Sequence, residues 1–583
     1  MEITLVTREL AVRGFGVDFL ASDAKKCRGR WMRAAAAAVV AGLMVSGMAA
    51  QNPPAVQGPL GPPEVHTQQG VVRGQLDFGG VAVFQGIPYA APPVGDLRWK
   101  PPQPAAGWEG VRDAVTAPHS CMQVNWGWNA RDAQDESEDC LYLNIATPRV
   151  HTAHLLPVIF WIHGGANYNG SGRYARGQTL TPHNVVLVSI NYRLGVFGFL
   201  ALPALTAESA HHSSGNYALL DQLAALRWVR DNIAAFGGDP QNVTIAGQSA
   251  GAIDVGFLLT TPDSKGLFAK AIDESGGPIA PTPVLDNLHE GETQGEMFAG
   301  FAGAAPEPNQ LAALRAMTAA DLLEAGHRYT APDKEGVPTH QGPEPVVDGW
   351  VLPMQPAAAI RDGTSHAVPL LIGSNIQEFS FGMSSVIQEN ALPDPPEAVR
   401  RVIERNFGEE SPDAMAAYGL ARSDAPPVDP QLGSVGTQLM TDTLFRCPAR
   451  IAGDWLSKRG VVVWEYQFER PLPGTGSAST RHSGELPYVF GWAQITRSGV
   501  MGATFGPADV TLSQHMQGYW INFAKTGDPN GPGLPNWPGY AGNAPALMHF
   551  TTEGTAEASV SASRAPCSFL KTHLEQMLKA AHP

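Results

Sequence analysis

Basic residues are scarce in this sequence relative to acidic ones. The 583 residues include 39 Lys and Arg against 54 Asp and Glu, which gives a formal net charge of −15. Nucleic-acid binding needs a basic surface that meets the phosphates, so this balance argues against a nucleic-acid partner. Internal repeats and long low-complexity stretches are also lacking. The composition, 44% hydrophobic and 16% charged, is that of an ordinary globular protein.

The chain has no convincing membrane span. Its one apolar run near the N-terminus, Ala34 to Ala50, is short and rich in alanine, and it follows the basic segment Lys25 to Arg33. Basic, then apolar, then small residues is the layout of a secretory signal, with cleavage after Ala49 or Ala50. We therefore expect residues 1–50 to be an N-terminal extension and signal, with Met32 a possible true start. The mature protein is then secreted or periplasmic, and without membrane association. The alternative is an uncleaved anchor.

Cysteine is rare. Cys27 would leave with the signal, so four cysteines would remain in an oxidising compartment: Cys121, Cys140, Cys447 and Cys567. Four cysteines allow three pairings. Proximity in the chain favours Cys121 with Cys140, which leaves Cys447 with Cys567. The alternative is that all four are buried thiols.

Residues 51–65 are a Pro-rich lead-in. We expect residues 66–583 to form one large domain with an α/β pattern. Short continuous apolar runs indicate strands that are covered on both faces, and they lie at Pro157–Ile162, Val185–Ile190, Asn242–Ala246, Pro369–Ile372 and Val461–Phe468. Tyr217–Phe236 carries an apolar stripe at three- and four-residue steps, which predicts a helix that ends at Gly237. Alternating strands and helices predict a mostly parallel sheet flanked by helices, with residues 280–365 forming a helical cap.

A G-x-S-x-G pentapeptide, Gly247 to Gly251, directly follows one of these strands and precedes the helix-compatible run Ala252–Leu259. Strand, tight turn and helix form a nucleophile elbow, which presents the serine hydroxyl at the head of a helix. Ser249 is therefore the predicted nucleophile. The alternative, a plain glycine turn with an unreactive serine, fits this context less well.

The segment His163-Gly164-Gly165-Ala166 follows another predicted strand and is a variant of the HGGG motif. Backbone N–H groups of that motif bind the negative oxygen of a tetrahedral intermediate. We expect the amides of Gly165, Ala166 and Ala250 to form this oxyanion hole.

A serine hydroxyl is a weak nucleophile that needs a base, and the base needs an acid to orient it. In enzymes that carry a nucleophile elbow on such a sheet, the acid and then the histidine follow the serine in the chain, each beyond the end of a strand. Glu378 follows the strand at Pro369–Ile372, and His482 follows the strand at Val461–Phe468. These two residues are the predicted acid and base.

Four segments add to these motifs: Phe84–Trp99 (FQGIPYAAPPVGDLRW), Glu138–Asn144 (EDCLYLN), Asn191–Gly198 (NYRLGVFG) and Phe236–Gly251 (FGGDPQNVTIAGQSAG). Together they resemble the type-B carboxylesterase family, which includes the cholinesterases and bacterial para-nitrobenzyl esterases. The resemblance covers about residues 66–570. The resemblance implies an α/β-hydrolase fold, a Ser249–Glu378–His482 triad, the same oxyanion hole, and disulfides Cys121–Cys140 and Cys447–Cys567.

The sequence departs from the family pattern at two positions. Gln248 stands before the serine where the family has Glu, which removes a negative charge that would stabilise the imidazolium. Ala166 stands in the last position of the oxyanion segment, where glycine would have more freedom in φ.

The sequence thus predicts a secreted serine esterase that acts through an acyl-enzyme on a small-molecule ester, as a monomer or homodimer. No metal or cofactor is needed for this chemistry. Two rival interpretations are a non-catalytic binding protein on the same fold, and an acyltransferase or amidase that uses the same acyl-enzyme.

Overall fold

A large mixed sheet organises the computed structural model of the chain. The structure describes residues 61–581, apart from 78, 176, 280–283, 305–308, 332–339, 341, 380–395, 423–425, 496–497, 542–544 and 561–563. The predicted signal at 1–50 therefore lies outside the described residues, as does most of the lead-in. Glu64 and Val65, which the predicted lead-in included, belong to strand β1 (Glu64–His66).

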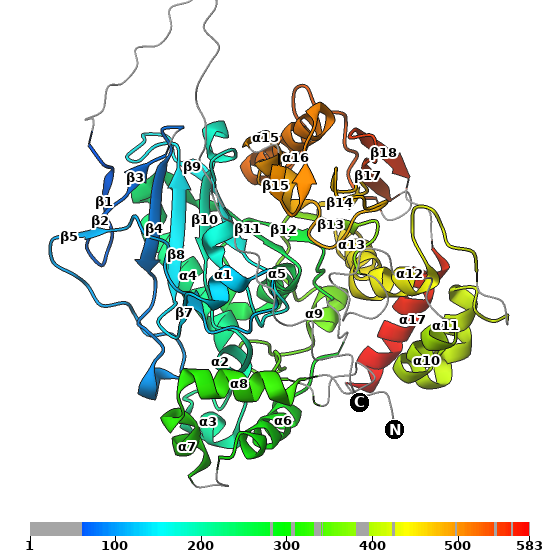
Figure 1. Cartoon of the computed structure of the whole chain (residues 1–583), viewed down its shortest axis with the longest axis horizontal. Helices are drawn as coiled ribbons and strands as arrows, with labels where there is room; N and C mark the ends of the chain where they lie inside the picture. Colours follow the sequence, from blue (N-terminus) through cyan, green and yellow to red (C-terminus); the bar gives the residue numbers. More distant parts are fainter. Residues whose placement is uncertain are drawn as a thin grey trace, which may run out of the picture. The chain divides into compact units, whose positions relative to one another are not determined.

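Within the described residues the main sheet has eleven strands, in the order β18-β17-β14-β13-β12-β11-β9-β10-β8-β4-β3. In Figure 1 it runs from β4 on the left to β18 on the right. The strands are β3 (Gln75–Leu76), β4 (Ala82–Pro88), β8 (Tyr142–Thr147), β9 (Leu156–Ile162), β10 (Val186–Ile190), β11 (Gly238–Gln248), β12 (Lys270–Glu274), β13 (Leu370–Asn375), β14 (Val463–Phe468), β17 (Ala546–Phe550) and β18 (Ala556–Val560). The block from β10 to β17 is parallel, and the pairings beyond it on both sides are antiparallel.

All five predicted strands are present, with boundaries that move by a few residues. Strand β12 was not predicted. Its sequence KAIDE contains Lys270, Asp273 and Glu274, yet all of its residues are buried. Charged side chains in a fully buried strand defeat a search for apolar runs.

Helices cover both faces of the sheet. Alternate residues of β9 belong to different hydrophobic clusters: Phe160 packs with residues of helices α4 (Tyr217–Asn232) and α5 (Ala250–Thr260), and Trp161 packs with residues of α16 (Pro507–Thr526). This alternation follows from the period of two in a strand. The predicted helix Tyr217–Phe236 is α4 followed by one 3₁₀ turn, η4 (Ile233–Phe236), and it ends at Gly237, whose φ is 83°.

The predicted cap at 280–365 contains α6 (Leu288–Phe301), α7 (Gln310–Ala316), α8 (Ala319–Tyr329) and α9 (Pro356–Asp362). Helix α8 contacts α2 (Gly195–Phe199), and α3 (Pro203–Glu208) lies in the same group of helices in Figure 1. A second helical group has its own small apolar core, which includes Val399, Ile403 and Leu439. This group consists of α10 (Pro396–Phe407), η7 (Gly408–Glu410), α11 (Ser411–Ala417) and α12 (Val435–Thr441), and it packs against α17 (Ala565–Ala580).

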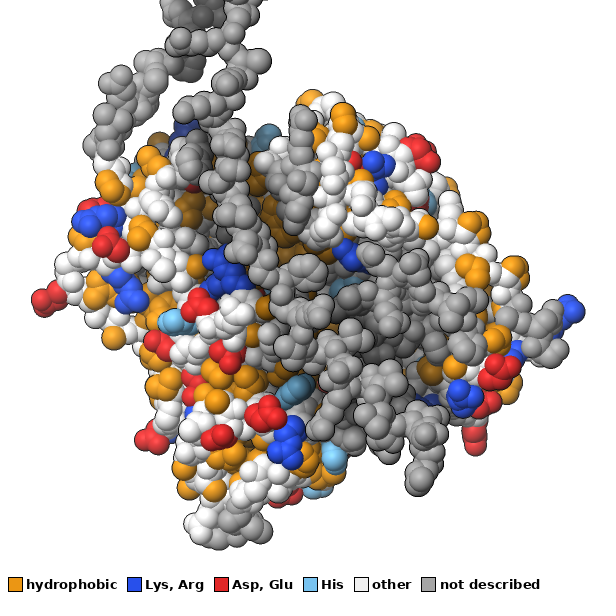
Figure 2. All heavy atoms as spheres, in the orientation of Figure 1, with side chains coloured by type: hydrophobic (Ala, Val, Ile, Leu, Met, Phe, Trp, Pro, Cys, Tyr) orange, Lys and Arg blue, Asp and Glu red, His pale blue; other side chains and the backbone are white. Residues whose placement is uncertain are grey.

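Helix α13 (Cys447–Ser457) lies in the chain just before β14. The remaining elements are short: η1 (Gly95–Leu97), α1 (Ala130–Ala133), η2 (Gly172–Tyr174), η3 (Thr181–His183), η5 (Pro262–Ser264), η8 (Asp442–Arg446), α14 (Leu486–Val489), α15 (Trp492–Ile495), and strands β2 (Val71–Arg73), β5 (Val111–Asp113), β6 (Ser120–Cys121), β7 (Glu136–Ser137), β15 (Ser498–Val500) and β16 (Ala503–Thr504). Among the helices in the described ranges, none combines the length and apolar character needed to cross a bilayer. On the described part of the face in Figure 2, basic and acidic side chains are interspersed rather than gathered into one basic field.

Candidate active site

Ser249 lies at the sharp turn between β11 and α5. Its backbone is in a strained conformation, with φ 57° and ψ −128°, as a nucleophile elbow requires. The flanking glycines are needed for space: a Cβ on Gly247 would lie 2.3 Å from the carbonyl oxygen of Gly251, and one on Gly251 would lie 2.2 Å from that of Ile162. The sequence therefore builds this turn locally, and Ala250 becomes the first residue of α5 with its amide at the helix head.

The segment after β9 lies against this serine. A Cβ on Gly164 would be 2.9 Å from Cβ of Ser249. Gly165, Ala166 and Asn167 all have positive φ, at 119°, 55° and 59°. For Ala166 this conformation costs about 1 kcal/mol relative to glycine, so the surrounding contacts have to hold it.

Those contacts come from a buried group of polar residues that sequence reasoning missed. The Asn167 side chain donates to Asp254 at 3.0 Å and accepts from the Tyr192 hydroxyl at 3.2 Å. Gln222 donates to the other oxygen of Asp254 at 2.6 Å. Burial raises the pKa of Asp254 to about 7. Asp254 follows the pentapeptide by one helical turn, and this spacing is the sequence feature that could have indicated a carboxylate near the elbow.

His163 begins the same segment and is not part of the acid–base set. Its ring stacks on Tyr192 with centroids 4.5 Å apart, and its Nδ1 lies 2.9 Å from the carbonyl oxygen of Gly164. Burial lowers the pKa of His163 to about 4, so it is neutral at pH 7. It packs the segment without adding a charge.

Glu378 and His482 lie together next to the elbow. Glu378 Oε2 is 2.8 Å from His482 Nδ1, and the His482 amide donates to the Glu378 carbonyl at 2.9 Å. Asn375, at the end of β13, donates to both oxygens of Glu378, from its backbone at 2.8 Å and its side chain at 3.1 Å. The rings of Phe379 and Phe445 lie 4.4 and 5.0 Å from the His482 ring. These contacts fix the carboxylate and the imidazole in one orientation.

The other nitrogen of His482 does not meet the serine. Its Nε2 lies 3.2 Å from the side-chain nitrogen of Gln248, and Ser249 Oγ makes no hydrogen bond to any residue that the structure describes. With Nδ1–H directed at Glu378, Nε2 is a hydrogen-bond acceptor, and Gln248 occupies it. Catalytic hydrogen bonds are often formed only once substrate is bound, so a rotation of Gln248 would free Nε2 for Ser249.

Buried carboxyl groups lie beneath the triad candidates, and sequence reasoning gave them no role. Glu485 accepts from the Asn375 side chain at 2.7 Å, and Glu274 accepts from the Trp520 indole at 2.7 Å. Burial raises the pKa of Glu485, with a further contribution from the charge of Glu378. Burial, together with Glu485, raises the pKa of Glu274 well above its usual range. Burial also raises the pKa of Asp273 to about 8, so the neutral acid predominates at pH 7.

The structure contains both disulfides, Cys121–Cys140 and Cys447–Cys567. The second lies beside Asp442 in the one cluster of potential metal ligands found among the described residues. Because both of its sulfurs are in the disulfide, this cluster offers no thiolate to a metal.

The chain is similar to known proteins over most of its length. The family model described as "Carboxylesterase family" matches residues 61–570. The chain is 35% identical over 513 residues to the fumonisin B1 esterase of Sphingopyxis macrogoltabida, covering 86% of this chain and 89% of that protein. It is 36% identical over 509 residues to the para-nitrobenzyl esterase of Bacillus subtilis, covering 85% of this chain and 96% of that protein.

Solved structures of esterases are also similar to this chain. The Geobacillus stearothermophilus carboxylesterase EST55 matches with a TM-score of 0.72 and 34% identity, over 85% of this chain and 98% of that one. A PNB esterase structure matches with a TM-score of 0.71 and 33% identity, over 88% of this chain and 99% of that one. The fold is thus the α/β-hydrolase fold that the sequence predicted.

Proposed function

Since this chain belongs to the carboxylesterase family and is a carboxylic ester hydrolase, we propose that it works through an acyl-enzyme on Ser249, with His482 as the base and Glu378 as the acid that orients it. The observation that carries this proposal is the 2.8 Å contact between Glu378 Oε2 and His482 Nδ1, beside a serine in the elbow conformation. A carboxylate at Nδ1 selects the tautomer with Nε2 as proton acceptor and stabilises the imidazolium that forms.

In the first step Ser249 Oγ forms a bond to the ester carbonyl carbon while its proton passes to Nε2 of His482. The carbonyl oxygen becomes an oxyanion that accepts hydrogen bonds from the amides of Gly165, Ala166 and Ala250. The C–O bond to the alcohol then breaks, and the alcohol leaves with the proton from His482. Water repeats the sequence on the acyl-enzyme and releases the acid.

We also propose that the protein is exported. The basic and apolar layout of residues 25–50 supports cleavage near Ala49 or Ala50. Two disulfides in the described domain support an oxidising compartment, secreted or periplasmic. Recovery of the protein only from the cytoplasm would contradict export. Mass spectrometry of the exported protein tests cleavage: an N-terminus still at Met1 or Met32 would contradict it.

The substrate is a small-molecule ester, and the related proteins extend from a fumonisin B1 esterase to a para-nitrobenzyl esterase. We propose that this chain, as a monomer or homodimer, accepts small aryl esters. A panel of nitrophenyl esters that vary in acyl length and charge gives its preference.

Reaction with an organophosphate tests the nucleophile directly. Intact mass should rise by one phosphoryl adduct, and peptide mapping should place that adduct on Ser249. An active wild-type enzyme that takes the adduct on another residue would overturn the assignment. A wild-type enzyme that takes no adduct and hydrolyses no ester would support the rival interpretation as a binding protein.

A further inference from the structure

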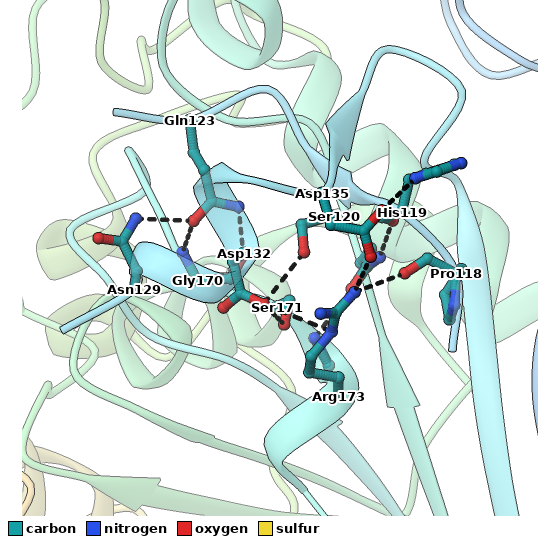
Figure 3. Close-up of polar contacts among 12 residues, drawn as sticks. Pro118, His119, Ser120, Gln123, Asn129, Asp132, Asp135, Gly170, Ser171 and Arg173 are labelled. Atoms are coloured by element: carbon teal, nitrogen blue, oxygen red, sulfur yellow. Dashed lines mark hydrogen bonds and ion pairs between the residues drawn. The ribbon is translucent and has the colours of Figure 1, made fainter. Parts of the chain in front are cut away.

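A polar network joins the disulfide-closed segment 121–140 to the residues just beyond the oxyanion segment. In Figure 3, Asn129 contacts Gln123, which contacts Gly170. Asp132 contacts Ser171 and Arg173, and Asp135 contacts Arg173. These contacts tie each end of the stretch Gly170–Arg173 to one loop.

Gln123 is the centre of this network at Gly170. Its Nε2 donates to the Gly170 carbonyl at 3.0 Å, and its Oε1 accepts from the Gly170 amide at 2.9 Å. The same Nε2 donates to the Cys121 carbonyl at 3.0 Å, and the same Oε1 accepts from Asn129 at 2.9 Å. The side chain is 1% exposed, so water cannot replace these bonds without opening the packing.

Gly170 and its neighbour Asn169 are in close contact with the oxyanion segment. A Cβ on Gly170 would lie 2.4 Å from the carbonyl oxygen of Gly164, and a Cβ on Gly165 would lie 2.0 Å from the carbonyl oxygen of Asn169. The Asn169 amide also donates to the Gly165 carbonyl at 3.0 Å. Because no space separates these backbones, a shift of Gly170 moves Gly164 and Gly165 with it.

The other end of the stretch is fixed by charge. Asp132 Oδ1 accepts from Ser171 at 3.1 Å and from Ser120 at 3.2 Å. Arg173 donates to Asp135 at 2.8 Å and to the Pro118 carbonyl at 3.0 Å. Gly170 therefore lies between a charged anchor on one side and the oxyanion segment on the other, and Gln123 sets its position.

We propose that Gln123 is a positioning residue for the oxyanion hole, which it aligns through Gly170 without touching the substrate. This proposal rests on the proposed function of Gly165 and Ala166. Oxyanion donors act only when they are aimed at the transition-state oxygen, so a displaced segment lowers kcat more than it weakens substrate binding.

The test is Gln123→Met, which keeps the side-chain length and removes every hydrogen bond of the amide. We expect kcat on a nitrophenyl ester to fall about 10- to 100-fold, with KM within about threefold, because small misplacements of a reacting group have effects of this size.

Gln355→Met is the matched control. Gln355 is buried and makes the same paired bonds with a backbone, accepting from the Leu285 amide at 2.8 Å and donating to the Leu285 carbonyl at 2.7 Å, but in the cap. We expect it to lower the melting temperature about as much as Gln123→Met while kcat stays within about twofold.

A trifluoromethyl ketone supplies a readout that general loosening would not move. Ser249 Oγ adds to its carbonyl carbon, the proton passes to His482, and the hemiketal oxygen occupies the oxyanion hole. Its Ki should rise in Gln123→Met in proportion to the loss of kcat/KM, and stay constant in Gln355→Met. Equal kcat in the two variants, or an unchanged Ki for Gln123→Met, would overturn the proposal. A wild-type enzyme without esterase activity would instead refute the proposed triad.

Discussion

The side-chain nitrogen of Gln248 lies 3.2 Å from Nε2 of His482, at the atom that would accept the proton of Ser249. A neutral amide therefore contacts the proposed base. An amide N–H can donate to the neutral imidazole but offers no charge to the imidazolium. This contact makes residue 248 the position at which we expect the pH dependence of the reaction to be set.

Gln248→Glu should move the acidic limb of kcat/KM to higher pH by about one unit. A carboxylate beside Nε2 favours the imidazolium, which cannot act as base. The measurement is the pH profile on an uncharged aryl ester. Gln248→Met serves as a control that removes the hydrogen bond without adding charge. An acidic limb that coincides in the wild type and Gln248→Glu would contradict this prediction.

Ser249→Ala should lose about 10³-fold or more in kcat while it remains folded, because no other nucleophile lies at the elbow. Thermal denaturation of the variant confirms folding, and an active-site titration of the wild type excludes contaminating esterase. Full activity of the alanine variant on a small aryl ester would contradict the assignment of Ser249 as the nucleophile.

Glu378→Gln should lower kcat by about 10³- to 10⁴-fold with a smaller change in KM. The amide cannot stabilise the imidazolium, and it can turn His482 to the tautomer with the proton on Nε2. Steady-state kinetics at several pH values provide the measurement. If the variant kept more than about a tenth of wild-type kcat, Glu378 would not be the orienting acid.

Asp273→Asn should flatten the pH dependence of stability. Burial raises the pKa of Asp273 to about 8. The unfolded chain is ionised from about pH 4, so this group must take up a proton on folding, and it destabilises the fold increasingly as pH rises from about 4 to 8. The asparagine variant keeps an acceptor for the Gly277 amide, which lies 2.8 Å from the Asp273 carboxyl.

The free energy of unfolding from urea denaturation at pH 5, 6, 7 and 8 gives the readout. The variant should gain about 1 kcal/mol on the wild type for each pH unit. A constant difference across this range would show that Asp273 is ionised in the folded protein.

Replacing Cys447 and Cys567 together by serine should lower stability by about 3–5 kcal/mol, since this disulfide joins α13 to α17 across a sequence separation of 120 residues. Activity per folded molecule should change less than about twofold, because neither cysteine contacts the triad candidates. Urea denaturation gives the change in stability, and active-site titration gives the activity per folded molecule. A large loss of kcat in the fully folded variant would show that α17 influences the candidate active site.

The local pattern alone predicted much of the fold. Apolar runs located the strands β9, β10, β11, β13 and β14. The family resemblance, which the comparisons confirm, supplied the architecture. Strand β12 was missed because its buried Asp273 and Glu274 look like surface residues in a sequence. The second helical group, α10 to α12, was also missed, since its small core is separate from the sheet.

The sequence by itself determined the elbow at Ser249, because a glycine-flanked turn between strand and helix depends on neighbouring residues. The tertiary structure decided which side chains meet across the chain: Glu378 with His482 at a separation of 104 residues, and His482 with Gln248 at 234. It also decided that Gln123 reaches Gly170, and that Asp273 is buried with its Oδ2 lacking a hydrogen-bond partner among the described residues. Local patterns encode backbone conformation. Contacts between distant segments, and the protonation that burial imposes, exist only after the sheet and helices have packed.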